Sequence, residues 1–382
     1  MVGRRREESM KGAKRRWRTD CRFFPGDRPC AHRRECEGCD LHEPWGRRVL
    51  VLKIGAIGDV LRTTPILRPL AGGSASPVHV TWVVGEAARP LLNGHPRIDR
   101  VLTPGAEADA ILAVEDFDLL LSLDKDPWPT ARAMTVTATE KRGFGRDRNG
   151  VVIPLHPSAE YAWELGLSDR LKFQENQRVY QDLIGEVCGI PWDGEEYDVP
   201  APADDSATGR RILESAGIAV GSGPLVGFNT GAGGIFANKA WTGDAYATLA
   251  GRLAAEGCRV ALLGGRAEAE RNERIARLSE GAAVDTGFEH SLPEFAGLIS
   301  HFDLVVTGDT LGMHLAIAGR VPVVALFGST CPQEIELYGR GEKIITPMDC
   351  HPCYRHTCDL SPGCQDLIPV DAVHEAVRRI LT

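Results

Sequence analysis

The chain has 382 residues, 43% of them hydrophobic and 25% charged, which is the length of two domains and the composition of a soluble globular protein. No apolar run is long enough to span a bilayer and no hydrophobic segment follows the basic N-terminus, so we expect a cytoplasmic protein without a signal peptide. The net charge is −8, yet residues 1–48 hold 14 Lys and Arg against 8 Asp and Glu. We expect a solvated basic tail over residues 1–19, with peripheral contact to the anionic inner face of the membrane as the alternative and no nucleic-acid partner.

Residues 1–46 form a basic, cysteine-rich segment. Two of its cysteines have the CxxC spacing of a metal knuckle, in which two thiolates from one tight turn bind one ion. Disulfides are rare in a reducing cytosol, so a structural zinc or iron ion is favoured over disulfides and free thiols. The predicted ligands are Cys21, Cys30, Cys36 and Cys39.

A buried strand is predicted at residues 49–54, followed by a turn of small residues, Gly-Ala-Ile-Gly, and a helix that Asp59 opens. This order is typical of the start of a Rossmann-like domain. The turn lacks the full GxGxxG pattern, so a dinucleotide is not indicated. Asp59 either interacts with the helix N-terminus or presents a catalytic carboxylate at the carboxyl edge of the sheet.

Further strands are predicted at residues 78–84, 101–102 and 119–123, with helices between them. Residues 141–145 are interpreted as a loop or short strand with basic flanks, and residues 157–188 as helical. A stretch rich in proline and acidic residues at 191–206 then indicates a linker. The predicted domains are therefore 47–200 and 201–382.

The second half begins like the first, with a strand at residues 225–229 and a glycine-rich loop at 230–234. Such a loop offers unhindered backbone N–H groups for phosphate, and Lys239 could add a point charge. An ordinary strand–helix loop with a surface lysine fits the spacing equally well. A helix at 244–256, a strand at 259–263, a helix from Glu268, a short strand and turn at 284–288 and a helix at 292–299 follow.

Residues 303–328 predict a parallel βαβ unit, with strands at 303–307 and 321–327 and a helix at 311–318 that ends at Gly319. Asp309, Thr310 and His314 fall at the carboxyl edge of this sheet, where ligands bind in such folds. The alternative is that Asp309 caps the helix and His314 packs under the loop.

The C-terminal part holds a second group of four cysteines within fifteen residues, followed by a helix at 369–382. Four thiolates so close together could close one tetrahedral site, for which zinc and iron are both open. Such a site has no open position for chemistry, so its expected role is structural. The alternatives are free thiols or one site shared with the N-terminal group. The predicted ligands are Cys350, Cys353, Cys358 and Cys364.

Five motifs over residues 47–382 together resemble the heptosyltransferases of glycosyltransferase family 9. They are LKIGAIGDVLRTTPIL, GAGGIFANKAW, LLGGRAEAE, TGDTLGMHLAIAGRVPVVALFG and the cysteine-rich end CHPCYRHTCDLSPGC. The resemblance implies an α/β GT-B fold, in which two Rossmann-like domains face an interdomain cleft. Leu311-Gly312 stands where many members have glycine first, and the N-terminal cysteine block is not part of the common family pattern.

The resemblance further implies an inverting glycosyltransferase that moves a sugar, usually heptose from ADP-heptose, to a glycan, glycolipid or protein hydroxyl. Asp59 matches the general base, Lys239 the diphosphate ligand and Glu268 a ribose contact. No catalytic metal is expected, because lysine, backbone N–H groups and helix N-termini would meet the leaving charge. The other expected donor contacts are Thr230, Gly231, Asp309, Thr310, Gly312 and His314, and the expected acceptor contacts are Lys53, Arg62 and Arg142.

Two other functions are weighed against transfer. A sugar-nucleotide epimerase would need a second acid–base group near the anomeric carbon, and no carboxylate is paired with Asp59 in the sequence. A non-catalytic, metal-stabilised binding module with the same fold is the other alternative, against which the presence of Asp59, Lys239 and Asp309 argues. An assay of donor hydrolysis or of sugar transfer distinguishes these functions.

Overall fold

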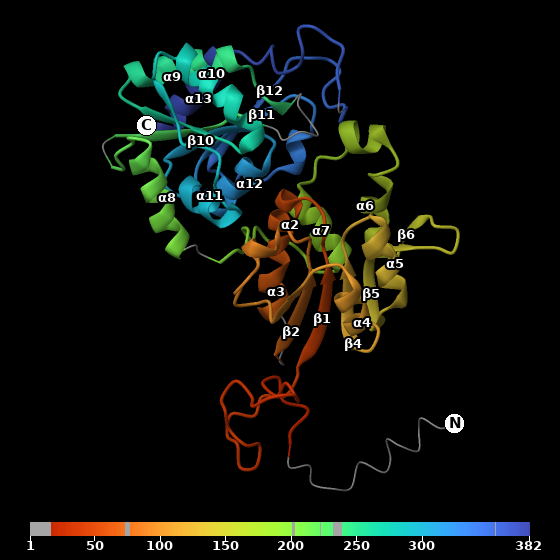
Figure 1. The fold of residues 1–382 in the computed structure, drawn as a ribbon. Coiled ribbons are helices and arrows are strands. Elements are labelled where there is room, and N and C mark those ends of the chain that lie inside the picture. Colours follow the sequence, from red (N-terminus) through yellow and green to blue (C-terminus); the bar gives the residue numbers. More distant parts are fainter. Residues whose placement is uncertain (1–16, 73–76, 201–202, 222, 232–238, 356) are drawn as a thin grey trace.

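A computed structural model describes residues 17–72, 77–200, 203–221, 223–231, 239–355 and 357–382. Most of the predicted basic tail and residues 232–234 of the predicted glycine-rich loop lie outside these ranges. Two six-stranded sheets, each covered by helices, make up the bulk of the molecule (Figure 1). The prediction of an α/β protein with two Rossmann-like domains is confirmed.

The first sheet has the order β3-β2-β1-β4-β5-β6, parallel except for β6, which runs antiparallel to β5. Its central strands are apolar on both faces because helices cover both sides, and the last four residues of β1 are buried. The strands are β1 (Arg47–Leu52), β2 (Val78–Val83), β3 (Arg100–Leu102), β4 (Asp116–Ser122), β5 (Thr137–Arg146) and β6 (Val152–Pro154). The helices are α2 (Ile57–Thr63), α3 (Leu67–Gly72), α4 (Ala106–Leu112), α5 (Pro127–Thr135), α6 (Glu160–Glu164) and α7 (Tyr180–Cys188).

The second sheet is parallel throughout, in the order β12-β11-β10-β7-β8-β9. Its three central strands, β10, β7 and β11, are fully buried, as their continuous apolar runs predict. The strands are β7 (Leu225–Asn229), β8 (Arg259–Leu263), β9 (Ala283–Asp285), β10 (Leu304–Gly308), β11 (Val323–Phe327) and β12 (Gly341–Ile345). The helices are α8 (Ala203–Ser215), α9 (Gly243–Ala255), α10 (Ala269–Leu278), α11 (Leu292–Ile299), α12 (Leu311–Ala318) and α13 (Val370–Leu381).

The structure settles two local predictions. Residues 141–145, predicted as a loop or short strand, lie within the ten-residue strand β5, whose half-buried charged side chains pair with each other, as Arg142 does with Glu140. Residues 157–188, predicted as helical, form several helical segments. A short turn at 157–159 leads into α6, and a second turn at Leu171–Glu175 lies between α6 and α7. The buried Asn176 ends the second turn, because its side-chain oxygen accepts the backbone N–H of Arg178 instead of leaving that group to a helix.

The two sheets meet through α2 of the first half and α12 of the second, which pack against each other. Residues 17–46 lie at the far end of the first sheet, away from this contact (Figure 1). A bridge between Cys21 and Pro44 closes this segment on itself, and an ion pair of 2.6 Å from Arg22 to Asp99 fastens it to the first half. Helices of the described residues are all too short or too polar to cross a membrane. The division into domains 47–200 and 201–382 stays a proposal, which the two separate sheets support.

Candidate active site

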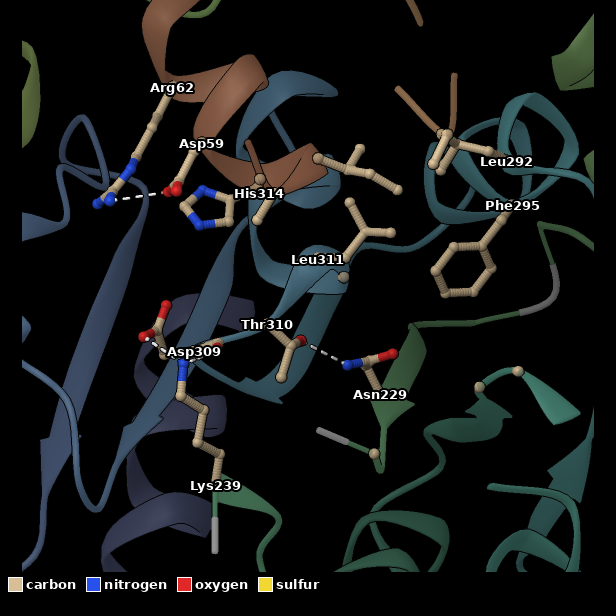
Figure 2. A pocket seen from close by; sticks show the side chains of 18 of the residues that line it. Asp59, Arg62, Asn229, Lys239, Leu292, Phe295, Asp309, Thr310, Leu311 and His314 are labelled. Atoms are coloured by element: carbon tan, nitrogen blue, oxygen red, sulfur yellow. Dashed lines mark hydrogen bonds and ion pairs between the residues drawn. The ribbon is translucent and has the colours of Figure 1, made fainter. Parts of the chain in front are cut away.

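A cavity of about 850 Å³ lies between the two halves, at the carboxyl ends of both parallel sheets. The first half contributes the loop after β1 and the start of α2, and the second half contributes the loops after β7, β8 and β10. Nine of the predicted site residues line this cavity, most of them visible in Figure 2. They are Asp59, Arg62, Gly231, Lys239, Glu268, Asp309, Thr310, Gly312 and His314.

The loop after β1 is held by a carboxylate from a neighbouring strand. Asp124, just beyond β4, accepts the backbone N–H groups of Ile54 and Gly55 and pairs with the ammonium group of Lys53. These bonds fix the turn that leads into α2. Gly58 is required in it, because a Cβ atom there would lie 2.4 Å from the imidazole of His314 in the other half. The absence of a side chain therefore lets the two halves approach closely beside Asp59.

Asp59 lies in the first turn of α2 and Arg62 one turn later, with 2.8 Å between their carboxylate oxygen and guanidinium nitrogen. Burial by itself would raise the pKa of Asp59, but Arg62 and Lys53 outweigh it and hold that pKa below its ordinary value. The guanidinium of Arg62 lies over the ring of Tyr180, 3.7 Å from its centroid. The Asp59 side chain remains 35% exposed, so a ligand in the cavity can reach it.

On the other side of the cavity Lys239 faces the loop after β10. Its ammonium group lies 3.1 Å from the carboxylate of Asp309 and 3.2 Å from the backbone oxygen of the same residue. Burial would raise the pKa of Asp309, but Lys239 and His314 outweigh it, so that pKa is lowered. The carboxylate of Asp309 therefore stays ionised at neutral pH. Asp309 does not cap α12: the N-cap residue is Thr310, and its side chain makes no capping hydrogen bond.

The start of α12 is open towards the cavity. Thr310 instead receives a hydrogen bond of 2.8 Å from the side-chain amide of Asn229, which also donates to Thr307 over 3.0 Å. Gly312 packs directly on that amide, since a Cβ atom there would lie 2.6 Å from Asn229. Asn229, the last residue of β7, was not predicted as a site residue. The sequence feature that could have indicated its role is a polar residue at the end of a buried strand, next to a glycine-rich loop.

His314 lies near the carboxylates of both Asp59 and Asp309, and Figure 2 shows its ring beside Asp59. Its Nδ1 atom is 3.0 Å from the hydroxyl of Tyr197, and burial, with Arg62 close by, lowers the pKa of His314 to about 4. The imidazole is therefore neutral at pH 7. Tyr197 belongs to the stretch predicted as a linker, and sequence reasoning missed it because its partner lies 117 positions further along the chain.

Glu268 closes the cavity from the loop after β8, where its carboxylate accepts the backbone N–H of Gly265 over 2.9 Å. Gly231 lies against the same side chain, because a Cβ atom there would be 2.2 Å from it. The side chain of the neighbouring Thr230 points elsewhere: it is fully buried and donates to Asn272. If Thr230 contacts the donor as predicted, it does so through its backbone.

Comparisons with known proteins fit this geometry. Residues 178–363 match the family described as glycosyltransferase family 9 (heptosyltransferase). Lipopolysaccharide heptosyltransferase 1 of Pseudomonas aeruginosa is 28% identical over 344 residues, which cover 84% of this chain and 89% of that protein. The resemblance to the heptosyltransferases of family 9 is confirmed, and these relatives indicate a glycosyltransferase.

Solved structures agree on the fold of this glycosyltransferase. A family 9 glycosyl transferase from Veillonella parvula superposes with a TM-score of 0.67 at 19% identity, covering 88% of this chain and 97% of that one. E. coli heptosyltransferase WaaC with ADP-2-deoxy-2-fluoro heptose gives 0.58 at 19% identity, covering 87% and 99%. The predicted GT-B fold and the prediction of a glycosyltransferase are both confirmed.

Two of the predicted acceptor contacts of this glycosyltransferase are not part of the cavity wall. Lys53 is 4% exposed and is bound to Asp124. Burial alone would lower its pKa, but Tyr180 and the neighbouring carboxylates keep that pKa raised. Arg142 pairs with Glu140 on β5 and lies across Gly189. The structure therefore assigns both side chains to holding the first half together, and of the three only Arg62 reaches the cavity.

No predicted metal site has the geometry of one. Within the described residues, no three His, Cys, Asp or Glu side chains converge closely enough to hold an ion. The N-terminal cysteines Cys21, Cys30, Cys36 and Cys39 do line one small cavity. Of the C-terminal group, Cys364 is buried, Cys353 partly buried, and Cys350 and Cys358 exposed. All eleven cysteines lie in the described residues, and no disulfide joins any two of them.

The structural metal ions of this glycosyltransferase stay a prediction. Elemental analysis of protein purified without added metal tests it: two equivalents of zinc or iron indicate separate sites, and one indicates a shared site or a single occupied group. No metal in reduced, folded protein would return the predicted ligands to free thiols.

Proposed function

We propose that this glycosyltransferase moves heptose from ADP-heptose to a hydroxyl of a lipopolysaccharide core, with inversion at the anomeric carbon. The heptosyltransferase relatives support the donor and the acceptor class. The single observation that carries the mechanism is the placement of Asp59 and Lys239 on opposite walls of one cavity. One wall offers a carboxylate that can take a proton, and the other offers fixed positive charge for a leaving diphosphate.

The reaction is a displacement in which the acceptor oxygen bonds to the anomeric carbon and the bond from that carbon to the diphosphate oxygen breaks. Asp59 takes the acceptor proton as the new bond forms, because a neutral hydroxyl is a poor nucleophile. Arg62, bonded to Asp59, keeps the carboxylate deprotonated and oriented. ADP leaves with the electron pair and gains negative charge.

That charge is met by groups of the second half. Lys239 supplies an ammonium group that Asp309 holds in place. The first turn of α12 supplies backbone N–H groups that its N-cap side chain leaves open, and a helix N-terminus favours an anion. Such preorganised donors stabilise the transition state more than water does, because they need no reorganisation during the reaction.

His314 and Glu268 have polar roles in this proposal. The neutral imidazole of His314 offers a hydrogen bond to the sugar between the two walls, with its orientation fixed by Tyr197. Glu268 stands at the loop after β8, where its carboxylate can accept hydrogen bonds from ribose hydroxyls. Both assignments follow from position and chemistry, and the resemblance to the family supports them.

The test is an assay of the purified enzyme with ADP-heptose and a lipopolysaccharide core that lacks heptose. We expect the acceptor mass to rise by one heptosyl unit, and the anomeric configuration of the product, read by NMR, to be the opposite of the donor's. ADP at ~100 times its dissociation constant should stabilise the fold by ~2.7 kcal/mol in a thermal shift. Transfer from a uridine or guanosine diphosphate sugar alone would contradict the proposed donor.

Contact with an anionic membrane, which a lipid-linked acceptor would favour, stays a proposal that rests on the basic N-terminal tail. Sedimentation with vesicles of anionic lipid at low and physiological salt tests it. Binding that disappears when residues 1–16 are removed would support the proposal, and equal binding without them would contradict it.

A further inference from the structure

At one end of the cavity the two halves touch through side chains that the proposed chemistry does not use. The helical turn Leu171–Glu175 extends from the first half towards the loops after β11 and β12, on the side of the molecule away from α8 (Figure 1). There the ring of Phe173 stacks on the ring of Tyr354, with 5.5 Å between centroids and an interplanar angle of 1°. The ammonium group of Lys172 lies 3.9 Å from the centre of the same tyrosine ring.

Polar contacts strengthen this junction. The side-chain amide of Gln333 donates to the backbone oxygen of Lys172 over 3.3 Å, and the ammonium group of Lys172 lies 3.9 Å from the carboxylate of Glu334. Lys172, Phe173, Gln333, Glu334 and Tyr354 are called the clasp below. A cation over an aromatic face and a parallel ring pair are each weak contacts at partly exposed sites, which suits a contact that opens and closes.

The clasp continues into the cavity. Tyr354 and Glu334 both line it, and the tyrosine hydroxyl donates to the Glu334 carboxylate over 3.3 Å. The same carboxylate lies 3.9 Å from the guanidinium of Arg62, which binds Asp59. A chain of polar contacts thus leads from the outer ring stack to the proposed base.

Tyr354 belongs to the cysteine-rich loop and is held from behind by the loop after β11. Its backbone φ of 51° lies in the left-handed region, and the N–H groups of Cys353 and Tyr354 both donate to the backbone oxygen of Ser329, over 3.0 and 2.9 Å. A non-glycine residue keeps such a conformation only where its surroundings hold it. The cysteine motif, which the proposed chemistry leaves unused, therefore presents an aromatic ring to the other half.

We propose that the clasp closes the cavity over bound substrates, and that Glu334 transmits this closure to Arg62 and Asp59. Tyr354 and Glu334 are then positioning residues for transfer: they act through Arg62 and through the exclusion of water. The inference rests on the proposed function for the role of Asp59. In the proposed function the donor is bound by the wall that holds Lys239, and none of the clasp residues belongs to its phosphate contacts. The clasp should therefore affect turnover and not nucleotide affinity.

The decisive variant is Phe173→Ala in the full-length enzyme, compared with Arg170→Ala on the same turn. Arg170 is exposed, and its ion pair within the described part of the chain is a local one, with Glu175. We expect Phe173→Ala to lower kcat about tenfold and to raise the fraction of donor lost to hydrolysis, because an open cavity admits water. Its affinity for ADP should stay within about twofold of wild type. Phe173→Tyr should restore both readouts, and Arg170→Ala should change neither.

A merely structural contact would lower the melting temperature without changing the ratio of hydrolysis to transfer. Wild-type kcat and wild-type hydrolysis in folded Phe173→Ala would overturn the proposal. If that variant does not fold, Lys172→Met removes the cation and keeps the side-chain length, and the same two readouts decide.

Hydrogen exchange separates failure of the clasp from failure of the proposed function, because it needs no turnover. Tyr354→Ala changes only the second half, yet it should speed amide exchange at residues 171–175 of the first half. Unchanged exchange there would overturn the clasp, whatever donor the enzyme uses. If wild type transfers no heptose while exchange behaves as expected, the proposed donor is wrong and the contact stands.

Discussion

The two walls of the cavity carry the same kind of ion pair in opposite arrangements. On the first wall Asp59 and Arg62 belong to one short helix and stand three positions apart. On the second wall Lys239 and Asp309 come from loops that are 70 positions apart in the chain. On the first wall the carboxylate of Asp59 is proposed to act in the reaction, as the base. On the second wall the cation, Lys239, is proposed to act, as the diphosphate ligand.

The difference shows how a pair of one carboxylate and one cation can serve two chemical tasks. A local pair on a helix supplies, from within one element, the main interaction that lowers the pKa of a base. A pair across two loops fixes a cation where several strand ends meet, which is where a diphosphate has to be neutralised. Changes to either wall should therefore have different signatures.

The largest effect is expected at the first wall. Asp59→Asn keeps the shape of the side chain but removes the proton acceptor, so kcat should fall by about 100- to 10,000-fold. Asp59→Ala should behave alike. ADP affinity, measured by calorimetry, should stay nearly unchanged in both, because the nucleotide binds the other wall. Turnover like that of wild type in either variant would remove Asp59 from the mechanism.

A smaller loss with a different pattern is expected at the second wall. Lys239→Ala should weaken ADP binding and lower kcat/KM by roughly 100-fold, since the ammonium group acts on both bound and leaving diphosphate. It also leaves Asp309 facing the phosphates alone. The double variant Lys239→Ala/Asp309→Asn should therefore bind ADP more tightly than the single one. Equal ADP affinity in wild type and Lys239→Ala would contradict the assignment.

The sequence was sufficient for what depends on local pattern. Continuous apolar runs predicted the buried parallel strands, and the loops that follow them carried Asp59, Lys239 and Asp309 to the carboxyl edges of the sheets. Parallel topology alone brings such loops together, so these residues meet as expected.

The sequence was not sufficient where a side chain's partner lies far along the chain. Lys53 was expected at the acceptor, but Asp124 binds it 71 positions later and draws it into the fold. Tyr197 resembled part of a linker, because nothing nearby in the sequence shows the histidine to which it bonds. Tyr354 stood inside a cysteine motif, and its ring partner on the other half could not be seen before the two halves were placed together.

The first wall can be probed more finely through its cation. Removing the charge in Arg62→Gln deletes the main interaction that lowers the pKa of Asp59, while Lys53, His314 and Tyr180 still face it. The pKa of Asp59 should then rise. Because a base works only when deprotonated, the acid limb of the kcat/KM profile should move to higher pH. An acid limb that stays in place would show that Asp59 titrates independently of Arg62.

The smallest expected effect concerns stability and the histidine between the walls. His314 has a folded-state pKa of about 4 against an ordinary value of 6.5, so the unfolded chain binds a proton more readily than the folded one between these two values. The stabilisation is fully present above pH 6.5 and is lost as pH falls towards 4. At most it amounts to about 3 kcal/mol.

His314→Gln removes this titration, so the comparison of interest is the difference between the unfolding free energies of wild type and variant. That difference should shrink as pH falls from 6.5 to 4, because only wild type loses stability through the imidazole. Urea unfolding at half-unit pH steps measures it, and carboxylates common to both proteins cancel in the subtraction. Parallel curves over this range would mean that His314 accepts a proton as easily in the folded cavity as in the unfolded chain, and its neutral role between the two walls would be lost.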